Sequence, residues 1–216
     1  MEEGSSVHIA CDLQEKIMDK VLLLYLIGKA KEEGNLGVTK LMKLTFLTEQ
    51  RMAEDRVKGF NYWFYKWRYG PFTQEIYDDL DCLMQNELIT ERGGIELTDR
   101  GLEFLNEIRG LLDENTIILK YIDGIAEEYG SIELNALIDR VDEIEPLGRK
   151  KIKDLLIGEH ILSKLSDLEA DRVFEIDDEW LETLDLLLNK EEYESLKEGM
   201  ESARITPSRK VTTADL

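Results

Sequence analysis

Few residues of this chain have the types and the spacing that catalysis requires. Its 216 residues include two histidines, His8 and His160, which stand too far apart to predict a histidine-activated nucleophile or a histidine metal cluster. The two cysteines, Cys11 and Cys82, form no CxxC pair. The sequence also lacks a P-loop, a GxGxxG stretch and an HExxH stretch. We therefore expect a protein that is not an enzyme and that holds no cofactor.

The remaining candidates for chemistry have simpler structural explanations. The pairs Asp79/Asp81 and Asp177/Asp178 could ligate a metal, but chance alone supplies such pairs among 47 acidic residues, so we expect no metal site. His160 is expected to be structural. Cys82 falls on the apolar side of its helix and reads as a small buried residue.

The charge of the chain points to the kind of partner it would attract. The net charge is −20; residues 1–110 carry 14 Lys and Arg against 20 Asp and Glu, and residues 111–216 carry 13 against 27. Such a surface repels nucleic acid and anionic membranes and attracts a basic partner, although solubility or adaptation to salt or heat would explain it equally well. The longest apolar run, 21–27, is too short to span a bilayer, and the N-terminus has no signal-peptide pattern. We expect a cytoplasmic protein that avoids membranes.

Hydrophobic periodicity places these residues on a mainly α (α+β) fold. Apolar spacing predicts helices over 13–31, 39–52, 73–88, 98–112, 118–129, 134–141 and 147–158, with Thr39, Thr73 and Thr98 as N-caps. The stretch 88–97 predicts two short strands joined by a Gly-Gly loop. Helix, helix, helix, hairpin and helix is the order of a winged helix-turn-helix domain whose wing is a small β-hairpin, followed here by a helical C-terminal region. The expected segments are 1–12 (flexible), 13–112 (winged-helix-like), 113–165 (helical extension), 166–203 (acidic amphipathic helical segment) and 204–216 (disordered tail).

An aromatic run, GFNYWFYKW over 59–67, has the period of a strand rather than a helix. Trp63, Tyr65 and Trp67 fall on one face, and Tyr62 and Phe64 fall on the other. The rings could stack on bases, while a core or edge strand is the plainer explanation.

The charge of the third helix argues against DNA reading. In a winged helix this element, here 73–88, enters the major groove. No Lys or Arg occurs between Tyr69 and Thr90, so its carboxylates would meet phosphate with nothing to offset them. The candidate nucleic-acid contacts of this alternative are therefore basic residues elsewhere: Lys40, Lys43, Arg51, Arg68 and Arg92. Solvated helix faces explain the same charges.

Two stretches resemble the Panacea domain. They are TKLMKLTFLTE (39–49), followed by the aromatic strand, and WRYGPFTQEIYDDLDCLMQNELI (67–89); YIDGIAEEYGSIELNALIDRV (121–141) is similar to a later helix pair of that family. The likeness covers residues 15–160, and its Gly-Pro…Glu-Ile-Tyr element is the most specific part. The resemblance implies a non-enzymatic antitoxin that binds a toxin, or an adaptor that delivers a partner to a protease. Lys66 in place of the usual alanine, a missing His-rich ending and the clear wing mark a divergent relative.

These observations together favour a protein-binding module of antitoxin type, with a winged-helix transcriptional regulator as the alternative. A basic toxin would suit the acidic C-terminal half, and a homodimer is left open. The stripe formed by Trp180, Leu184, Leu187 and Leu188 would either wrap a partner, dimerise or dock on its own domain. The candidate partner-binding residues are Trp67, Tyr69, Gly70, Pro71, Tyr77, Trp180, Leu184, Leu187 and Leu188.

Overall fold

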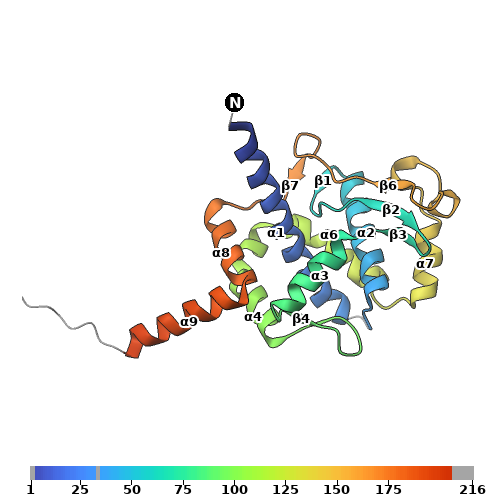
Figure 1. Cartoon of the computed structure of the whole chain (residues 1–216). Helices are drawn as coiled ribbons and strands as arrows, with labels where there is room; N and C mark the ends of the chain where they lie inside the picture. The colour runs from blue at the N-terminus through green and yellow to red at the C-terminus, as the bar shows by residue number, and fades with distance from the viewer. Residues whose placement is uncertain (1–2, 33–34, 206–216) are drawn as a thin grey trace, which may run out of the picture.

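The computed structural model describes the backbone of residues 3–32 and 35–205 and the side chains of residues 13–31 and 35–200. The fold is mainly helical, with small β-sheets beside the helices, as the sequence predicts (Figure 1). The α-helices are α1 (Glu3–Glu32), α2 (Val38–Glu54), α3 (Glu75–Gln85), α4 (Asp99–Glu107), α5 (Arg109–Glu114), α6 (Thr116–Tyr129), α7 (Leu134–Asp142), α8 (Asp178–Leu188) and α9 (Lys190–Ile205). The strands are β1 (Val57–Lys58), β2 (Phe64–Trp67), β3 (Gly70–Phe72), β4 (Ile89–Thr90), β5 (Glu96–Leu97), β6 (His160–Leu162) and β7 (Arg172–Val173).

Helix α1 passes through the middle of the molecule, because it is apolar nearly all round (Figure 1). Within the run 21–27 every side chain except Tyr25 is fully buried. Helix α6 packs against both α1 and α2, α7 packs against α2, and α8 packs against α1. The stretches 13–112, 113–165 and 166–203 therefore contribute to one continuous hydrophobic core. The expected flexible N-terminus is helical from Glu3 onward, so α1 begins ten residues before the expected helix.

Segments from the C-terminal half complete sheets that begin in the N-terminal half. Strand β2 lies between β3 and β6 in an antiparallel sheet, and β7 pairs in parallel with β1. The predicted hairpin is confirmed: β4 and β5 pair antiparallel, with Ile89 opposite Leu97. The order α3, hairpin, α4 is the one expected, but three strands separate α2 from α3, so the winged-helix comparison remains an interpretation.

The predicted N-caps have three different outcomes. Thr98 is confirmed, since its side chain accepts a hydrogen bond from the Gly101 amide at 3.1 Å. Thr73 Oγ1 accepts from the Glu75 amide at 3.3 Å, although the helix begins at Glu75. The prediction that Thr39 is an N-cap is wrong, because the N-cap of α2 is Gly37 and Thr39 lies inside the helix.

The helix predicted over 147–158 is not formed. Two single-turn 3-10 helices, Pro146–Gly148 and Ile152–Asp154, lie there instead. Leu147 (φ 48°), Gly148 (φ 71°) and Gly158 (φ 87°) adopt left-handed backbone conformations that an α-helix cannot continue through. The chain consequently turns and enters β6.

The tail expected over 204–216 lies mostly outside the described residues. The backbone of α9 includes residues 204 and 205, and residues 206–216 lie outside what the structure describes. No helix within the described part of the chain combines the length and the apolarity that crossing a bilayer demands.

Candidate functional site

The outer side of the β3–β2–β6 sheet carries a group of exposed aromatic rings. Burial alternates along β2, with Phe64 and Lys66 buried and Tyr65 and Trp67 exposed, as the period of the sequence predicts. Cross-strand pairing places Tyr65 opposite both Phe72 of β3 and His160 of β6, so these three side chains share one face. We call the following residues the aromatic face: Trp63, Tyr65, Trp67, Tyr69, Phe72, Tyr77 and His160.

The rings of the aromatic face contact one another in two groups. His160 lies between Trp63 and Tyr65, with ring centroids 5.6 Å and 5.5 Å away. Phe72 lies between Trp67 and Tyr77, at 6.1 Å and 5.9 Å. These distances fall in the range of favourable aromatic pairs, which restrict the rotamers of the rings. Every ring of the face except Tyr69 is therefore packed against a neighbouring ring before any partner arrives.

Five rings of the aromatic face are exposed to solvent. The exposed fractions are 40% for Trp63, 41% for Tyr65, 47% for Trp67, 64% for Tyr69 and 37% for Tyr77. The other side of the same run is core, since Phe60, Tyr62 and Phe64 are at most 1% exposed. A contiguous exposed apolar patch on a folded chain is typical of an interaction surface.

A pocket of about 250 Å³ opens at one end of the aromatic face. The lining residues are Thr39, Met42, Lys43, Trp67, Tyr69, Gly70, Pro71, Phe72 and Tyr77. Five residues proposed from the sequence as partner contacts, Trp67, Tyr69, Gly70, Pro71 and Tyr77, thus come together in one place. The pocket has room for a single large side chain of a partner.

Buried charges fix the wall of this pocket. Lys43 is 2% exposed and its ammonium donates to the Pro71 carbonyl at 2.6 Å. Burial lowers the pKa of Lys43 to about 8, against the opposing attraction of Asp142. Asp142 also forms an ion pair with Lys66 at 2.9 Å. Gly70 has φ 87° and lies so close to Asp142 that a Cβ would stand 3.3 Å from its carboxylate. These contacts hold the Trp67–Phe72 turn, and with it the pocket, in one shape.

Four residues of the aromatic face are not among the site residues expected from the sequence. Phe72 and His160 were not proposed as site residues, and Trp63 and Tyr65 were recognised as sharing a strand face without being proposed as contacts. The alternation over 62–67 was the signal for the two β2 residues. Nothing local identified His160, because the segment before it was expected to form a helix.

The proposed C-terminal contacts must be corrected. Leu184, Leu187 and Leu188 are 0%, 7% and 8% exposed, and the half-buried Trp180 packs its ring over Gly110. Arg100 donates to the Leu187 carbonyl at 2.9 Å and holds the end of α8 against α4. The stripe is therefore docked on the chain's own core and cannot wrap a partner. Burial of these leucines removes apolar surface from water, which stabilises the docked position of α8.

The basic residues proposed for nucleic acid also need correction. Lys40 is buried and donates to the Gly130 carbonyl, and Lys43 is buried under Pro71. Arg51 forms an ion pair with Glu128 at 2.8 Å. Arg68 and Arg92 are exposed, but they lie on different elements, next to β2 and in the β4–β5 hairpin. The five residues do not form one basic surface.

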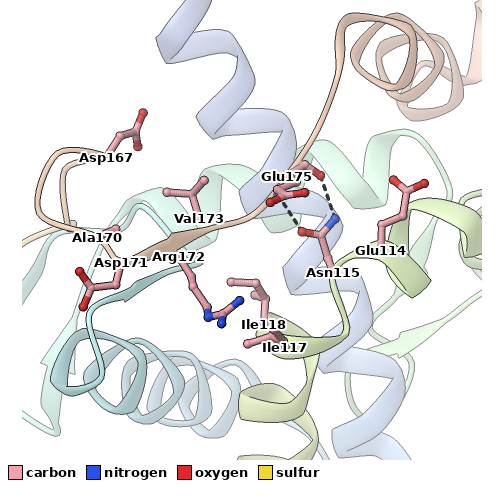
Figure 2. A pocket seen from close by; sticks show the side chains of 10 residues that line it. All are labelled: Glu114, Asn115, Ile117, Ile118, Asp167, Ala170, Asp171, Arg172, Val173 and Glu175. Atoms are coloured by element: carbon pink, nitrogen blue, oxygen red, sulfur yellow. Dashed lines mark hydrogen bonds between the residues drawn. The ribbon is translucent and has the colours of Figure 1, made fainter.

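A second pocket, away from the aromatic face, serves the fold rather than chemistry. About 420 Å³ in volume, it lies between the start of α6 and β7 (Figure 2). The Asn115 amide donates to the Glu175 carbonyl at 2.8 Å and accepts from the Glu175 amide at 2.7 Å. These bonds tie the strand leading to α8 onto the helices.

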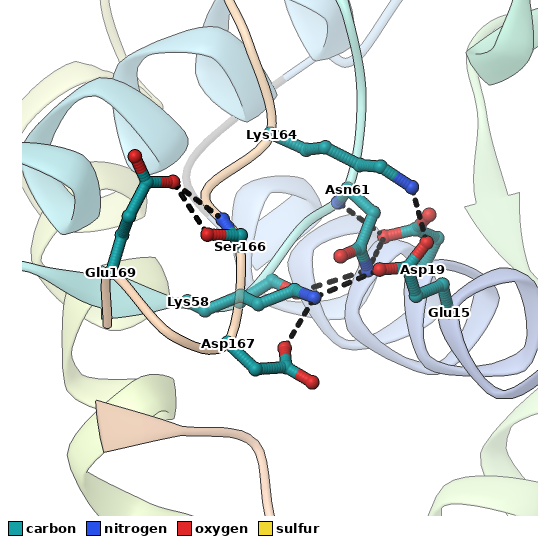
Figure 3. Close-up of polar contacts among 9 residues, drawn as sticks. Glu15, Asp19, Lys58, Asn61, Lys164, Ser166, Asp167 and Glu169 are labelled. Atoms are coloured by element: carbon teal, nitrogen blue, oxygen red, sulfur yellow. Dashed lines mark hydrogen bonds and ion pairs between the residues drawn. The ribbon is translucent and has the colours of Figure 1, made fainter. Parts of the chain in front are cut away.

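An ion-pair network attaches the loop between β6 and β7 to α1 (Figure 3). The buried Lys58 ammonium bonds to Glu15 at 2.8 Å and to Asp167 at 2.6 Å, and Lys164 also pairs with Glu15. Burial alone would raise the pKa of Glu15, but the hydrogen bonds from Lys164 and Lys58 outweigh it, so the pKa is lowered. The network is a structural clamp.

Asp19 and Glu49 are buried carboxyl groups that form no ion pair within the described part of the chain. Asp19 is 5% exposed and accepts from the Asn61 backbone amide at 2.8 Å, while Glu49 is 4% exposed and has only the Tyr62 backbone amide, among the described residues, to offset its burial. Burial raises the pKa of both groups well above their ordinary values. Within the described residues no group of three or more His, Cys, Asp or Glu side chains is arranged to hold a metal ion.

Comparison with known proteins found no relative: the chain matches no family model, no curated protein and no solved structure.

Proposed function

We propose that this chain is a non-catalytic protein-binding module of antitoxin type, which neutralises or delivers a partner protein through the aromatic face. The observation that carries the proposal is the set of tryptophan and tyrosine rings of the aromatic face, 37–64% exposed, three of which, Trp67, Tyr69 and Tyr77, line one pocket. Trp and Tyr dominate the binding energy of protein interfaces, because each buries a large area and loses little rotamer freedom. The resemblance of residues 39–49 and 67–89 to the Panacea domain supports the antitoxin class.

The position of the aromatic face suits a partner with an apolar anchor. Tyr69 and Trp67 stand at the mouth of the pocket, with Arg68 exposed between them in sequence. Arginine is the third residue type that is enriched at interface hot spots. A partner side chain entering the pocket would be surrounded by rings that are already in place, so little ordering entropy would be lost on binding.

The alternative is a winged-helix transcriptional regulator. It is favoured by the order of α3, the β4–β5 hairpin and α4. Charge opposes it: the exposed residues at and within α3 include Glu75, Asp78 and Asp81, and the helix has no basic residue. Asp79 of the same helix is buried and accepts a hydrogen bond from Tyr62 at 2.8 Å, so it would not face DNA. Phosphate contacts, which supply most non-specific DNA affinity, would have to come from elsewhere.

Co-expression separates the two functions. The chain is produced together with the product of each gene adjoining its own, and growth is scored. We expect the wild type to suppress the toxicity of one neighbour, and Trp67→Ala with Tyr69→Ala to lose that suppression. Leu102→Ala, which changes a 51%-exposed apolar side chain on α4, is the matched control and should protect like the wild type.

Two results would speak against the proposal. Equal protection by the aromatic variant and the wild type, at equal protein level, would show that the face is not the binding surface. If instead no neighbour is suppressed and the chain binds its own promoter DNA, the regulator is favoured. In that case Asp78→Asn with Asp81→Asn should increase DNA affinity only if α3 faces the DNA.

A further inference from the structure

Helix α9 carries an apolar stripe that begins on the body of the protein and continues beyond it. Tyr193 is buried, and its hydroxyl donates to Glu107 of α4 at 2.8 Å. Lys197 pairs with Glu103 of α4 at 2.7 Å and lies over the Tyr193 ring. Leu196 and Met200 follow at helical spacing and are 46% and 52% exposed. Figure 1 shows α9 extending away from the rest of the fold. The first turns are thus anchored while the continuation of the stripe lies uncovered.

The uncovered stripe forms one side of a groove. Leu186 of α8 and Leu196, Gly199 and Met200 of α9 line it, and its volume is about 720 Å³. A Cβ added at Gly199 would meet no atom within 4 Å, so the groove is open at that point. A groove of this volume accommodates several side chains of one helical segment rather than a single anchor.

The rim of the groove is acidic and has little positive charge to offset it. Residues 178–200 contain eight acidic residues against two basic ones. Both lysines are already paired, Lys190 with Glu87 at 2.7 Å and Lys197 with Glu103. Glu191 and Glu192 line the groove and have no ion-pair partner within the described structure. The field at the groove is therefore negative.

We propose that the α8–α9 groove binds a basic amphipathic segment of a partner protein. The apolar side chains of the segment would cover Leu186, Leu196 and Met200, and its Lys or Arg residues would face Glu191 and Glu192. A second copy of the chain is a poor occupant, because pairing two such grooves would place like charges opposite each other. This surface is separate from the aromatic face, and the inference does not depend on the antitoxin proposal.

A designed peptide tests the groove on the full chain. The probe is a fluorescently labelled amphipathic helix built of Leu and Lys, and the same helix built of Leu and Glu tests the charge requirement. We expect the basic peptide alone to bind. Leu196→Ser with Met200→Ser should weaken binding by about tenfold or more, because the apolar contacts are lost. Glu191→Gln with Glu192→Gln should weaken it as well and reduce its salt dependence.

Leu168→Ser is the matched control, since Leu168 is 98% exposed in the loop between β6 and β7. It should bind the peptide like the wild type. The changed side chains are all exposed, so circular dichroism should show each variant folded. Equal binding by the Leu196/Met200 variant would overturn the proposal, because the peptide would then be held by charge alone. A wild-type dimer that this variant dissociates would also overturn it, in favour of a second copy.

Discussion

Truncating Leu184 tests whether α8 belongs to the core. Leu184 is 0% exposed, and α8 packs against the central helix α1. Leu184→Ala removes buried methyl groups and leaves a cavity, which costs about 3 kcal/mol in comparable cores. For a domain of this size each kcal/mol lowers the melting temperature by about 2–4 °C, so we expect a decrease of roughly 6–12 °C.

The assay is urea unfolding followed by circular dichroism, together with a thermal scan. The midpoint should fall with little change in slope, since the surface exposed on unfolding stays similar. Leu196→Ala is the matched control on α9: its side chain is 46% exposed, and we expect a change within about 0.5 kcal/mol. A Leu184→Ala variant as stable as this control would refute the reasoning and would restore the idea of a free C-terminal stripe.

Three further predictions concern single groups. Burial raises the pKa of Glu49 above its ordinary 4.5, so the stability that Glu49 contributes is present below pH 4.5 and is lost as the pH rises. In urea unfolding, Glu49→Gln should therefore gain stability relative to the wild type between pH 5 and pH 8. A stability difference between variant and wild type that does not change with pH would contradict the burial argument. Burial lowers the pKa of Lys43 from 10.5 to about 8, so between these pH values the folded state binds fewer protons than the unfolded state, and stability should rise with pH. Lys43→Met should remove this rise in stability. A rise that persists in the variant would exclude Lys43 as its source. Thr98→Ala should cost about 1 kcal/mol through the lost cap on the Gly101 amide, with Thr98→Ser retaining most of it.

The parts of the fold that the sequence predicts are those with a strong local pattern. The helices over 13–31, 73–88 and 118–129 have clear periodicity, and each is observed with shifted ends. The alternation along 62–67 correctly separated core rings from exposed rings, because strand geometry sends neighbouring side chains to opposite faces. Local chemistry also identified Thr98 as a cap.

The parts that could not be predicted depend on distant contacts. Strand β6 is three residues long, and it is a strand because β2 offers an edge for it. The left-handed Leu147 that prevents a helix before β6 has no sequence signature comparable to a glycine. Likewise, the stripe on α8 has the same pattern whether it covers a partner or its own core, so periodicity alone could not choose between the two.

The candidate site was also predictable only in part. The sequence identified Trp67, Tyr69 and Tyr77, but it could not show that they surround one pocket with Met42 and Lys43 of α2. It also predicted Lys40 and Lys43 as possible nucleic-acid contacts, whereas both ammonium groups are buried and donate hydrogen bonds to backbone carbonyls. Long lysine side chains are solvated in most proteins, so their burial is a property of the fold.

The affinity of the purified chain for the partner found by co-expression tests the central claim most directly. Titration calorimetry compares the wild type with Trp67→Ala, Tyr69→Ala and the control Leu102→Ala. A central hot-spot residue contributes about 2 kcal/mol or more, so each aromatic change should weaken binding by roughly 30-fold while the control leaves it unchanged. Equal affinities for all four proteins, with each variant folded, would contradict the assignment of the aromatic face as the partner-binding surface.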